Sequence, residues 1–265
     1  MFGYIVLYVL IVGLANLVGV ISGMGGGVII KPLMDSLQVH SMATIDFFST
    51  VAVFTTSIVS TGRQLKTGAL AFSRRLLFIA VGAGIGGIAG KMWLSYLVGS
   101  LGEQSASGIQ IATTIVLLFV SIVYTFRFKH VSLHLSRNHW YFFASLSLGL
   151  LSSFMGIGGG PMNVALFLFA FGVDIKVSTM YSIVTIFSSQ LLKLATIGAD
   201  VFAARTVVLE DTGIVWFIIP AAIVGGIIGT RLSQYLSDAQ VEIIYLLICV
   251  VVLVINMMNL WHLIG

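Results

Sequence analysis

Long apolar segments dominate the sequence and limit what the chain can fold into. Ten of them lie near residues 2–21, 28–38, 42–61, 71–97, 108–126, 140–155, 161–172, 177–198, 212–236 and 240–262. A helix needs about 20 apolar residues to cross the hydrocarbon of a bilayer, and most of these segments approach or exceed that length. Only 8% of the residues are charged, against about 25% in a typical soluble domain. We therefore predict an all-α polytopic membrane protein.

A glycine run occurs twice, at matching places in the two halves of the chain. Gly-Met-Gly-Gly-Gly stands at residues 23–27, and Gly-Ile-Gly-Gly-Gly begins 133 residues later, at 156–160. Each run follows a long apolar segment and precedes a short one. Each glycine costs a helix roughly 1 kcal/mol relative to alanine. Interrupted segments in corresponding positions of two halves point to a transporter's binding site. We expect broken or short helices at both runs.

The charged residues predict how the segments are oriented. Basic residues gather in two loops, at 63–75 and 127–139, and the positive-inside rule assigns both loops to the cytoplasm. An acidic loop at residues 200–211, in which Arg205 is the single cation, then falls outside. This topology places nine of the 13 Lys and Arg residues in or beside inner loops. It predicts that both termini lie outside.

A second short motif supports an internal duplication. The pattern Gly-Gly-x-x-Gly occurs at residues 86–90 and again at 225–229. Small residues at this spacing let transmembrane helices approach closely, and we interpret both copies as packing motifs. We predict two inverted-topology repeats of about five helical segments each, at residues 1–126 and 140–265. The segment 127–139 would be a basic cytoplasmic connector between them.

The two glycine runs are candidate anion-binding elements. A helix that begins after each run presents unpaired N–H groups and the positive end of its dipole. Such helix ends bind anions, and two of them could hold one anion between them. An alternative is that the glycines only allow tight helix crossing. The predicted backbone donors are Gly25, Gly26, Gly27, Gly158, Gly159 and Gly160.

Several polar side chains near the runs are further candidates for the substrate site. They are Ser22, Asn163, Thr50, Ser182 and Lys193. Ser182 and Lys193 belong to a polar stripe at helical spacing in the eighth segment, and Thr50 belongs to a similar stripe in the third. Such stripes could line a hydrated route, although Ser and Thr in membranes also serve interhelical hydrogen bonding.

Two ionisable residues are candidates for coupling or gating. Lys31 and Asp46 lie within apolar segments, where charge is costly. Lys31 could bind an anion or snorkel to the surface. Asp46 could carry a coupling proton or cap a helix.

Signatures of other chemistry are missing from the sequence. It contains no HExxH, GxSxG or P-loop motif. Its single cysteine, Cys249, lies in an apolar run and is expected to be a small buried hydrophobe. His130, His134 and His139 share the basic connector without an accompanying acid or cysteine, so we interpret them as a loop and not as a metal site. We predict no enzyme, no metal, no cofactor and no nucleic-acid partner.

At the glycine runs the chain resembles the sulfite exporter family of the TauE/SafE type, also called the toluene-sulfonate uptake permeases. The shared pattern is Gly-x-Gly-Gly-Gly with a proline five residues on, here residues 23–32. The second copy has Ala165 where the first has Pro32, and its proline is Pro161, so the second helix is expected to start differently. The resemblance implies transport of small sulfur-containing or organic anions across a prokaryotic inner membrane.

Together these features predict a secondary transporter of a small anion such as sulfite, sulfoacetate, a sulfonate or a related carboxylate. The alternatives are a membrane-embedded accessory subunit and an anion channel without active coupling. The expected partners are the anionic substrate and the lipid bilayer, and a homodimer is left open. The expected location is the cell inner (cytoplasmic) membrane.

Overall fold

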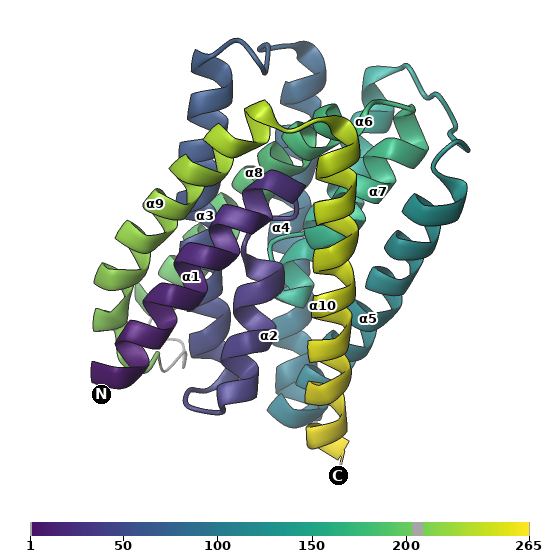
Figure 1. Cartoon of the computed structure of the whole chain (residues 1–265). Coiled ribbons are helices and arrows are strands. Elements are labelled where there is room, and N and C mark those ends of the chain that lie inside the picture. Colours follow the sequence, from purple (N-terminus) through teal and green to yellow (C-terminus); the bar gives the residue numbers. More distant parts are fainter. Residues whose placement is uncertain (1, 203–208, 265) are drawn as a thin grey trace.

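The computed structural model describes residues 2–202 and 209–264, and within them every long element is a helix (Figure 1). This confirms the all-α prediction. The α-helices are α1 (Phe2–Ser22), α2 (Gly27–Leu37), α3 (Met42–Lys66), α4 (Arg74–Leu101), α5 (Glu103–Val123), α6 (Asn138–Met155), α7 (Gly160–Phe171), α8 (Ile175–Phe202), α9 (Val215–Tyr235) and α10 (Asp238–Ile264). A π-helical turn, Tyr124–Phe128, extends α5, and a 3₁₀ turn, Thr212–Ile214, precedes α9.

Seven of the described helices are long and apolar enough to cross a membrane: α1, α3, α4, α5, α8, α9 and α10. Their outward positions carry large apolar side chains, including Leu14, Phe119, Trp216 and Val251. The helices α2 and α7 have only 11 and 12 residues. At 1.5 Å per residue they are about 16–18 Å long, roughly half the thickness of the hydrocarbon.

The two short helices form hairpins that enter the bundle from opposite ends. At the lower end of Figure 1, the Tyr8 hydroxyl of α1 bonds His40 Nδ1 just after α2, at 2.8 Å, so the open end of the α1–α2 hairpin lies there. The open end of the α6–α7 hairpin lies at the upper end, where Leu133 before α6 donates its N–H to the Phe169 carbonyl near the end of α7, at 2.8 Å. Both glycine runs therefore lie at the inner tips of the hairpins.

The two tips meet in the middle of the bundle. A Cβ atom at Gly27 would lie 2.5 Å from the Ile157 carbonyl oxygen, and one at Gly160 would lie 3.3 Å from Val28 Cγ2. Val53 of α3 packs between the runs, since its Cγ1 atom would lie 3.5 Å from a Cβ at Gly25 and 2.8 Å from a Cβ at Gly158. The predicted helix breaks at 23–27 and 156–160 are thus confirmed as breaks, and the two runs are neighbours.

The backbone of the two runs follows the same course at their first residues. Gly23 and Gly156 have φ of 71° and 70°, and Gly25 and Gly158 have φ of 68° and 77°. These left-handed conformations suit glycine, because a Cβ atom would be strained there. The runs then diverge: the N-cap Gly26 has φ −66°, whereas the N-cap Gly159 has φ 106°. The second helix starts differently, as the shifted proline predicts.

Small residues join the long helices in two equivalent crossings. Cβ atoms at Gly86 and Gly90 of α4 would overlap the carbonyl oxygens of Leu146 and Leu150 of α6. In the same way, Gly225 and Gly229 of α9 pack on the carbonyl oxygens of Gly13 and Leu17 of α1. Leu146 and Leu150 follow Gly13 and Leu17 by 133 residues each. The packing role predicted for both motifs is confirmed, and each half packs against the other through reciprocal contacts.

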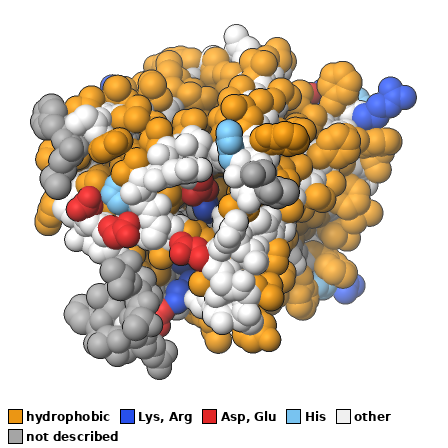
Figure 2. Space-filling view, turned by 90° about the horizontal axis from the view of Figure 1, so that it is seen from below, with side chains coloured by type: hydrophobic (Ala, Val, Ile, Leu, Met, Phe, Trp, Pro, Cys, Tyr) orange, Lys and Arg blue, Asp and Glu red, His pale blue; other side chains and the backbone are white. Residues whose placement is uncertain are grey.

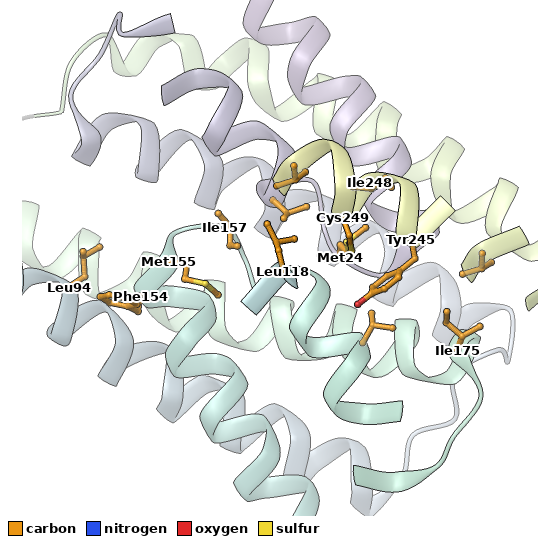
Figure 3. Close-up of a cluster of buried hydrophobic side chains, with 14 residues drawn as sticks. Met24, Leu94, Leu118, Phe154, Met155, Ile157, Ile175, Tyr245, Ile248 and Cys249 are labelled. Atoms are coloured by element: carbon orange, nitrogen blue, oxygen red, sulfur yellow. The ribbon is translucent and has the colours of Figure 1, made fainter. Parts of the chain in front are cut away.

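Helix α10 packs on both tips through one apolar cluster (Figure 3). Cys249 lies against Met24 of the first run, with their sulfur atoms 3.8 Å apart, and the Tyr245 hydroxyl donates to the Pro161 carbonyl next to the second run, at 2.7 Å. Cys249 is fully buried, as expected. This helix therefore supports both interrupted segments from one side.

Charged residues separate to the two ends of the bundle. A pocket at the upper end joins Arg74 and Arg75 to Asn138 and Tyr181, so the two basic loops share that end. Figure 2 shows a group of acidic side chains on the lower face. Asp35, Glu103, Asp200 and Glu210 line two pockets at this end of the bundle. Arg205 lies outside the described residues. We name these the basic end and the acidic end, and both chain termini lie at the acidic end (Figure 1).

Candidate functional site

A cavity of about 710 Å³ enters the bundle from the acidic end between α3, α4 and α8. Glu103 and Glu210 lie along it, and an ion pair between Lys91 and Asp200 forms part of its wall. Lys91 of α4 therefore reaches a carboxylate of α8. Asp46 of α3 lines the same cavity and lies next to the tip of the α6–α7 hairpin. The cavity extends from the acidic end as far as Asp46.

Asp46 forms a buried ion pair with Lys193 of α8. Lys193 Nζ lies 2.7 Å from Asp46 Oδ1, and the Lys193 side chain has no exposed surface. Because α3 and α8 pack side by side, the polar stripes predicted on their sequences bring these two residues together. Removing one partner of a buried pair leaves an uncompensated charge, so each of these residues depends on the other.

The second glycine run touches this pair directly. A Cβ atom at Gly156 would overlap Asp46 Oδ1 and would lie 3.1 Å from Lys31 Cδ and Cε. Lys31 Nζ itself binds Asp35 of the same helix at 3.0 Å. Lys31, Asp46 and Lys193, here called the charged cluster, thus come from α2, α3 and α8 and meet beside one hairpin tip. The structure brings together three residues that the sequence analysis treated separately.

A second polar layer surrounds the charged cluster one helical turn toward the basic end. The layer consists of Ser49, Gln190 and Ser153. Ser49 lies one turn from Asp46 on α3, Gln190 lies one turn from Lys193 on α8, and Ser153 on α6 lies one turn from Gly156. All three side chains are fully buried. Gln190 Nε2 bonds Ser152 Oγ at 3.4 Å, while Gln190 Oε1 and the hydroxyls of Ser49 and Ser153 have no partner among the described residues. Sequence analysis missed this layer, although an amide inside an apolar helix such as Gln190 is itself a signal.

The backbone donors differ between the two tips. The Gly25 N–H already donates to the Gly19 carbonyl at 3.0 Å, and Ile30 N–H donates to the Gly26 carbonyl at 2.9 Å. In the second run, the N–H groups of Gly158, Gly159 and Gly160 take part in no hydrogen bond within the described chain. The second tip therefore presents the larger set of unpaired N–H groups.

Three predicted hydroxyl ligands already have backbone partners. Ser22 donates to the carbonyls of Val18 and Gly19 at 3.1 Å, and Thr50 donates to the Asp46 carbonyl at 2.6 Å. Ser182 of α8 donates to the Gly23 carbonyl at 2.5 Å and so ties α8 to the first tip. These bonds agree with the alternative in which Ser and Thr serve helix packing.

Two buried asparagines have no such partners. Neither amide atom of Asn163, a predicted ligand, is hydrogen-bonded within the described residues, and the same holds for Asn16 of α1, which the sequence analysis missed. Both side chains are fully buried. The signal that would have found Asn16 is an amide in the middle of an apolar segment that precedes a glycine run.

No group of three or more His, Cys, Asp or Glu residues in the described part of the chain is arranged to hold a metal ion. His134 bonds the Ser132 hydroxyl at 2.8 Å within the connector. The candidate site is therefore built from backbone amides, neutral polar side chains and one buried ion pair.

These features define the class of the protein: a multi-pass helical membrane protein with two interrupted helical hairpins and a charged cavity leading to them. The family model of the sulfite exporter TauE/SafE matches residues 8–257, and the chain belongs to this family. The family resemblance seen in the glycine runs is thereby confirmed. Members of this family are transporters and not enzymes. No curated protein and no solved structure matches the chain.

Proposed function

We propose that this protein is a secondary transporter that holds one small anion at the paired hairpin tips. The observation that carries the proposal is the set of unpaired N–H groups at Gly158, Gly159 and Gly160, in the hairpin tip whose Gly156 lies against Asp46 of the cavity wall. Unpaired amides at a helix N-terminus stabilise negative charge, and they do so without a fixed cation that would retain the anion. Gly26 and Gly27 contribute the corresponding donors of the first tip.

The substrate is a compact anion. The tips are close enough for a Cβ atom at Gly27 to lie 2.5 Å from the Ile157 carbonyl oxygen, which leaves no room for a bulky group between them. Sulfite, sulfoacetate, small sulfonates and related carboxylates fit this limit, and family membership implies a small anionic substrate. The anion enters through the cavity at the acidic end, whose wall next to the second tip includes Asp46, the partner of Lys193.

The two halves act as inverted repeats that expose the anion to each side in turn. Support comes from the opposite entry of the two hairpins and from the reciprocal contacts of α4 with α6 and of α9 with α1. In the conformation described, the cavity reaches the site from the acidic end. The positive-inside rule assigns the basic end to the cytoplasm, so the acidic end and both termini face outside the inner membrane.

The proposal is tested by uptake of radiolabelled sulfite, sulfoacetate and a simple carboxylate into liposomes that contain the purified protein. A carrier also shows counterflow, in which unlabelled anion inside drives transient accumulation of labelled anion. A channel does not show counterflow, and an accessory subunit moves none of the three anions. Absence of flux from correctly folded protein therefore overturns the proposal.

The glycine site is tested by Gly26→Val and Gly159→Val. Each added side chain would overlap an asparagine amide at its tip and block the approach of an anion. We expect both variants to lose uptake while Gly62→Val, at an open position on α3, keeps it. Normal flux in both tip variants would remove the glycines from the site.

A further inference from the structure

The hairpin tips each hold one buried amide side chain that has no hydrogen-bond partner in the described chain. These are Asn16 on α1 and Asn163 on α7, and all four of their amide atoms are unpartnered. Buried polar groups in folded proteins are nearly always hydrogen-bonded, because leaving them unpaired is costly. Two such amides, one beside each hairpin tip, therefore point to a ligand that is not part of the chain.

Each amide lies against the glycine that caps the N-terminus of a short helix. A Cβ atom at Gly26 would overlap the Asn16 amide, and a Cβ atom at Gly159 would overlap the Asn163 amide. Gly26 and Gly159 are the N-caps of α2 and α7, and they stand 133 residues apart. Each short helix thus begins with an unpartnered asparagine amide beside its N-cap.

The two asparagines do not correspond to each other in the duplicated sequence. The residue 133 positions after Asn16 is Gly149, and the residue 133 positions before Asn163 is Ile30. One amide precedes its glycine run and the other follows it, yet both occupy the same place relative to a helix N-terminus. Duplication alone does not account for this arrangement.

We infer that Asn16 and Asn163 form a pair of substrate-binding amides, one from each half, that hold the oxygen atoms of a single oxyanion at the hairpin tips. The inference rests on the proposed function and adds the specificity-determining side chains. Each amide donates through Nδ2 to an anion oxygen, next to the N–H groups of the helix end. Neutral donors on both sides suit an oxyanion with several oxygen acceptors, such as a sulfite or sulfonate group.

The choice of neutral amides also fits a transported substrate. A fixed positive charge would bind an anion tightly and slow its release, whereas conduction requires binding that is weak enough to reverse. The two buried cations of the charged cluster are already paired, Lys193 with Asp46 and Lys31 with Asp35. The amides therefore select the anion by hydrogen-bond geometry, while the charged residues near the tips belong to the charged cluster.

The test measures sulfite and methanesulfonate binding to the purified full-length protein by isothermal titration calorimetry. We expect one anion per chain, and we expect Asn16→Leu and Asn163→Leu each to weaken sulfite affinity by about tenfold to a hundredfold, the contribution of one hydrogen bond to a charged group. Asn256→Leu is the matched control, because this buried asparagine of α10 donates to its own helix at Val252. It should leave the affinity unchanged.

Thermal unfolding without ligand separates a ligand role from a structural one. Replacing an unpartnered buried amide with leucine should leave the melting temperature of the ligand-free protein equal or higher, while reducing its increase on addition of sulfite. Asn16→Asp and Asn163→Asp should weaken anion binding further than leucine, because each adds a negative charge. Anion affinity in the Asp variants equal to that of the wild type would show that neither amide contacts the anion, and would overturn the inference.

Failure of the inference can be told apart from failure of the proposed function. Wild-type affinity and flux in both Leu variants would remove the asparagines from the site and leave the transporter proposal intact. Two anions per chain, with each variant losing one, would overturn the shared site. A wild-type protein that neither binds nor moves any of the tested anions would overturn both.

Discussion

The ion pair between Asp46 and Lys193 supports the sharpest prediction about the charged cluster. Their atoms are 2.7 Å apart, which corresponds to about 6 kcal/mol of Coulomb attraction at an effective dielectric constant of about 20. Much of this attraction offsets the cost of burying the two charges. Removal of one partner from a buried pair is nevertheless destabilising by about 3–5 kcal/mol, a large part of the roughly 5–15 kcal/mol that stabilises a folded protein.

The single substitutions Asp46→Asn and Lys193→Met should lower the stability of the protein by different amounts. Lys193 has no exposed surface, whereas Asp46 lines the cavity and is 8% exposed. Asp46→Asn leaves a fully buried ammonium group without a counterion and should cost the larger amount. Lys193→Met leaves a carboxylate that the cavity can hydrate and should cost less. The double variant removes both charges, and its stability should return close to that of the wild type.

The assay combines thermal unfolding in detergent with sulfite uptake in liposomes. Lys91→Met is the control, because its ion pair with Asp200 is more exposed on the cavity wall and should contribute less. We expect the double variant at Asp46 and Lys193 to be stable but inactive in uptake. An Asp46→Asn protein as stable as the wild type would refute the argument from burial, and full uptake by the double variant would show that the pair has only a structural role.

Two further predictions concern packing and topology. Gly86→Val should destabilise the protein by at least about 2 kcal/mol and separate α4 from α6, because its side chain would meet the Leu146 carbonyl. Gly99→Val, at an open position of α4, is the control and should not destabilise the protein. Equal melting temperatures of the two variants would contradict this prediction. The orientation is tested in a Cys249→Ala background with a membrane-impermeant maleimide added to intact cells. The reagent should label Ser95→Cys in the acidic-end cavity but not Ala71→Cys in the basic-end pocket. The reverse labelling pattern would invert the proposed orientation.

Local sequence signals were enough to predict the helices and their breaks. Hydropathy and the glycine runs act on the residues that carry them, and each of the ten predicted segments corresponds to one described helix. The largest boundary errors are at the end of the third segment, expected near residue 61, because α3 continues to Lys66, and at the start of the fifth, expected near residue 108, because α5 begins at Glu103. Gly102, with φ 81°, ends α4 there, and the polar first turn of α5 carries no apolar signal.

The site depends on which helix faces meet, and that information is not local. Asp46 and Lys193 are 147 residues apart, and only the packing of α3 against α8 brings them into contact. The polar stripes placed both residues on polar helix faces. They could not distinguish substrate ligands from hydroxyls that serve helix packing, since Thr50 and Ser182 of the same stripes donate to backbone carbonyls. The sequence shows Asn16 as an amide in an apolar segment, but its place beside the N-cap Gly26 is set by the packing of α1 on the first run.

The reciprocal packing gives a physical reason for two conformations of similar energy under the proposed function. The crossing of α4 with α6 and the crossing of α9 with α1 use equivalent glycines against equivalent carbonyls, so neither crossing is favoured by its chemistry. In the alternate conformation, each half would adopt the arrangement that the other half has here, so most contacts would be replaced by their counterparts. The free-energy difference between the two conformations then stays within the few kcal/mol that a ligand can shift. What distinguishes the two states is the charged cluster, because Lys31, Asp46 and Lys193 have no charged counterparts at Val164, Thr179 and Ser60, the matching positions of the duplicated sequence. The duplicated scaffold would then supply the motion, and the residues that break the duplication would supply its direction.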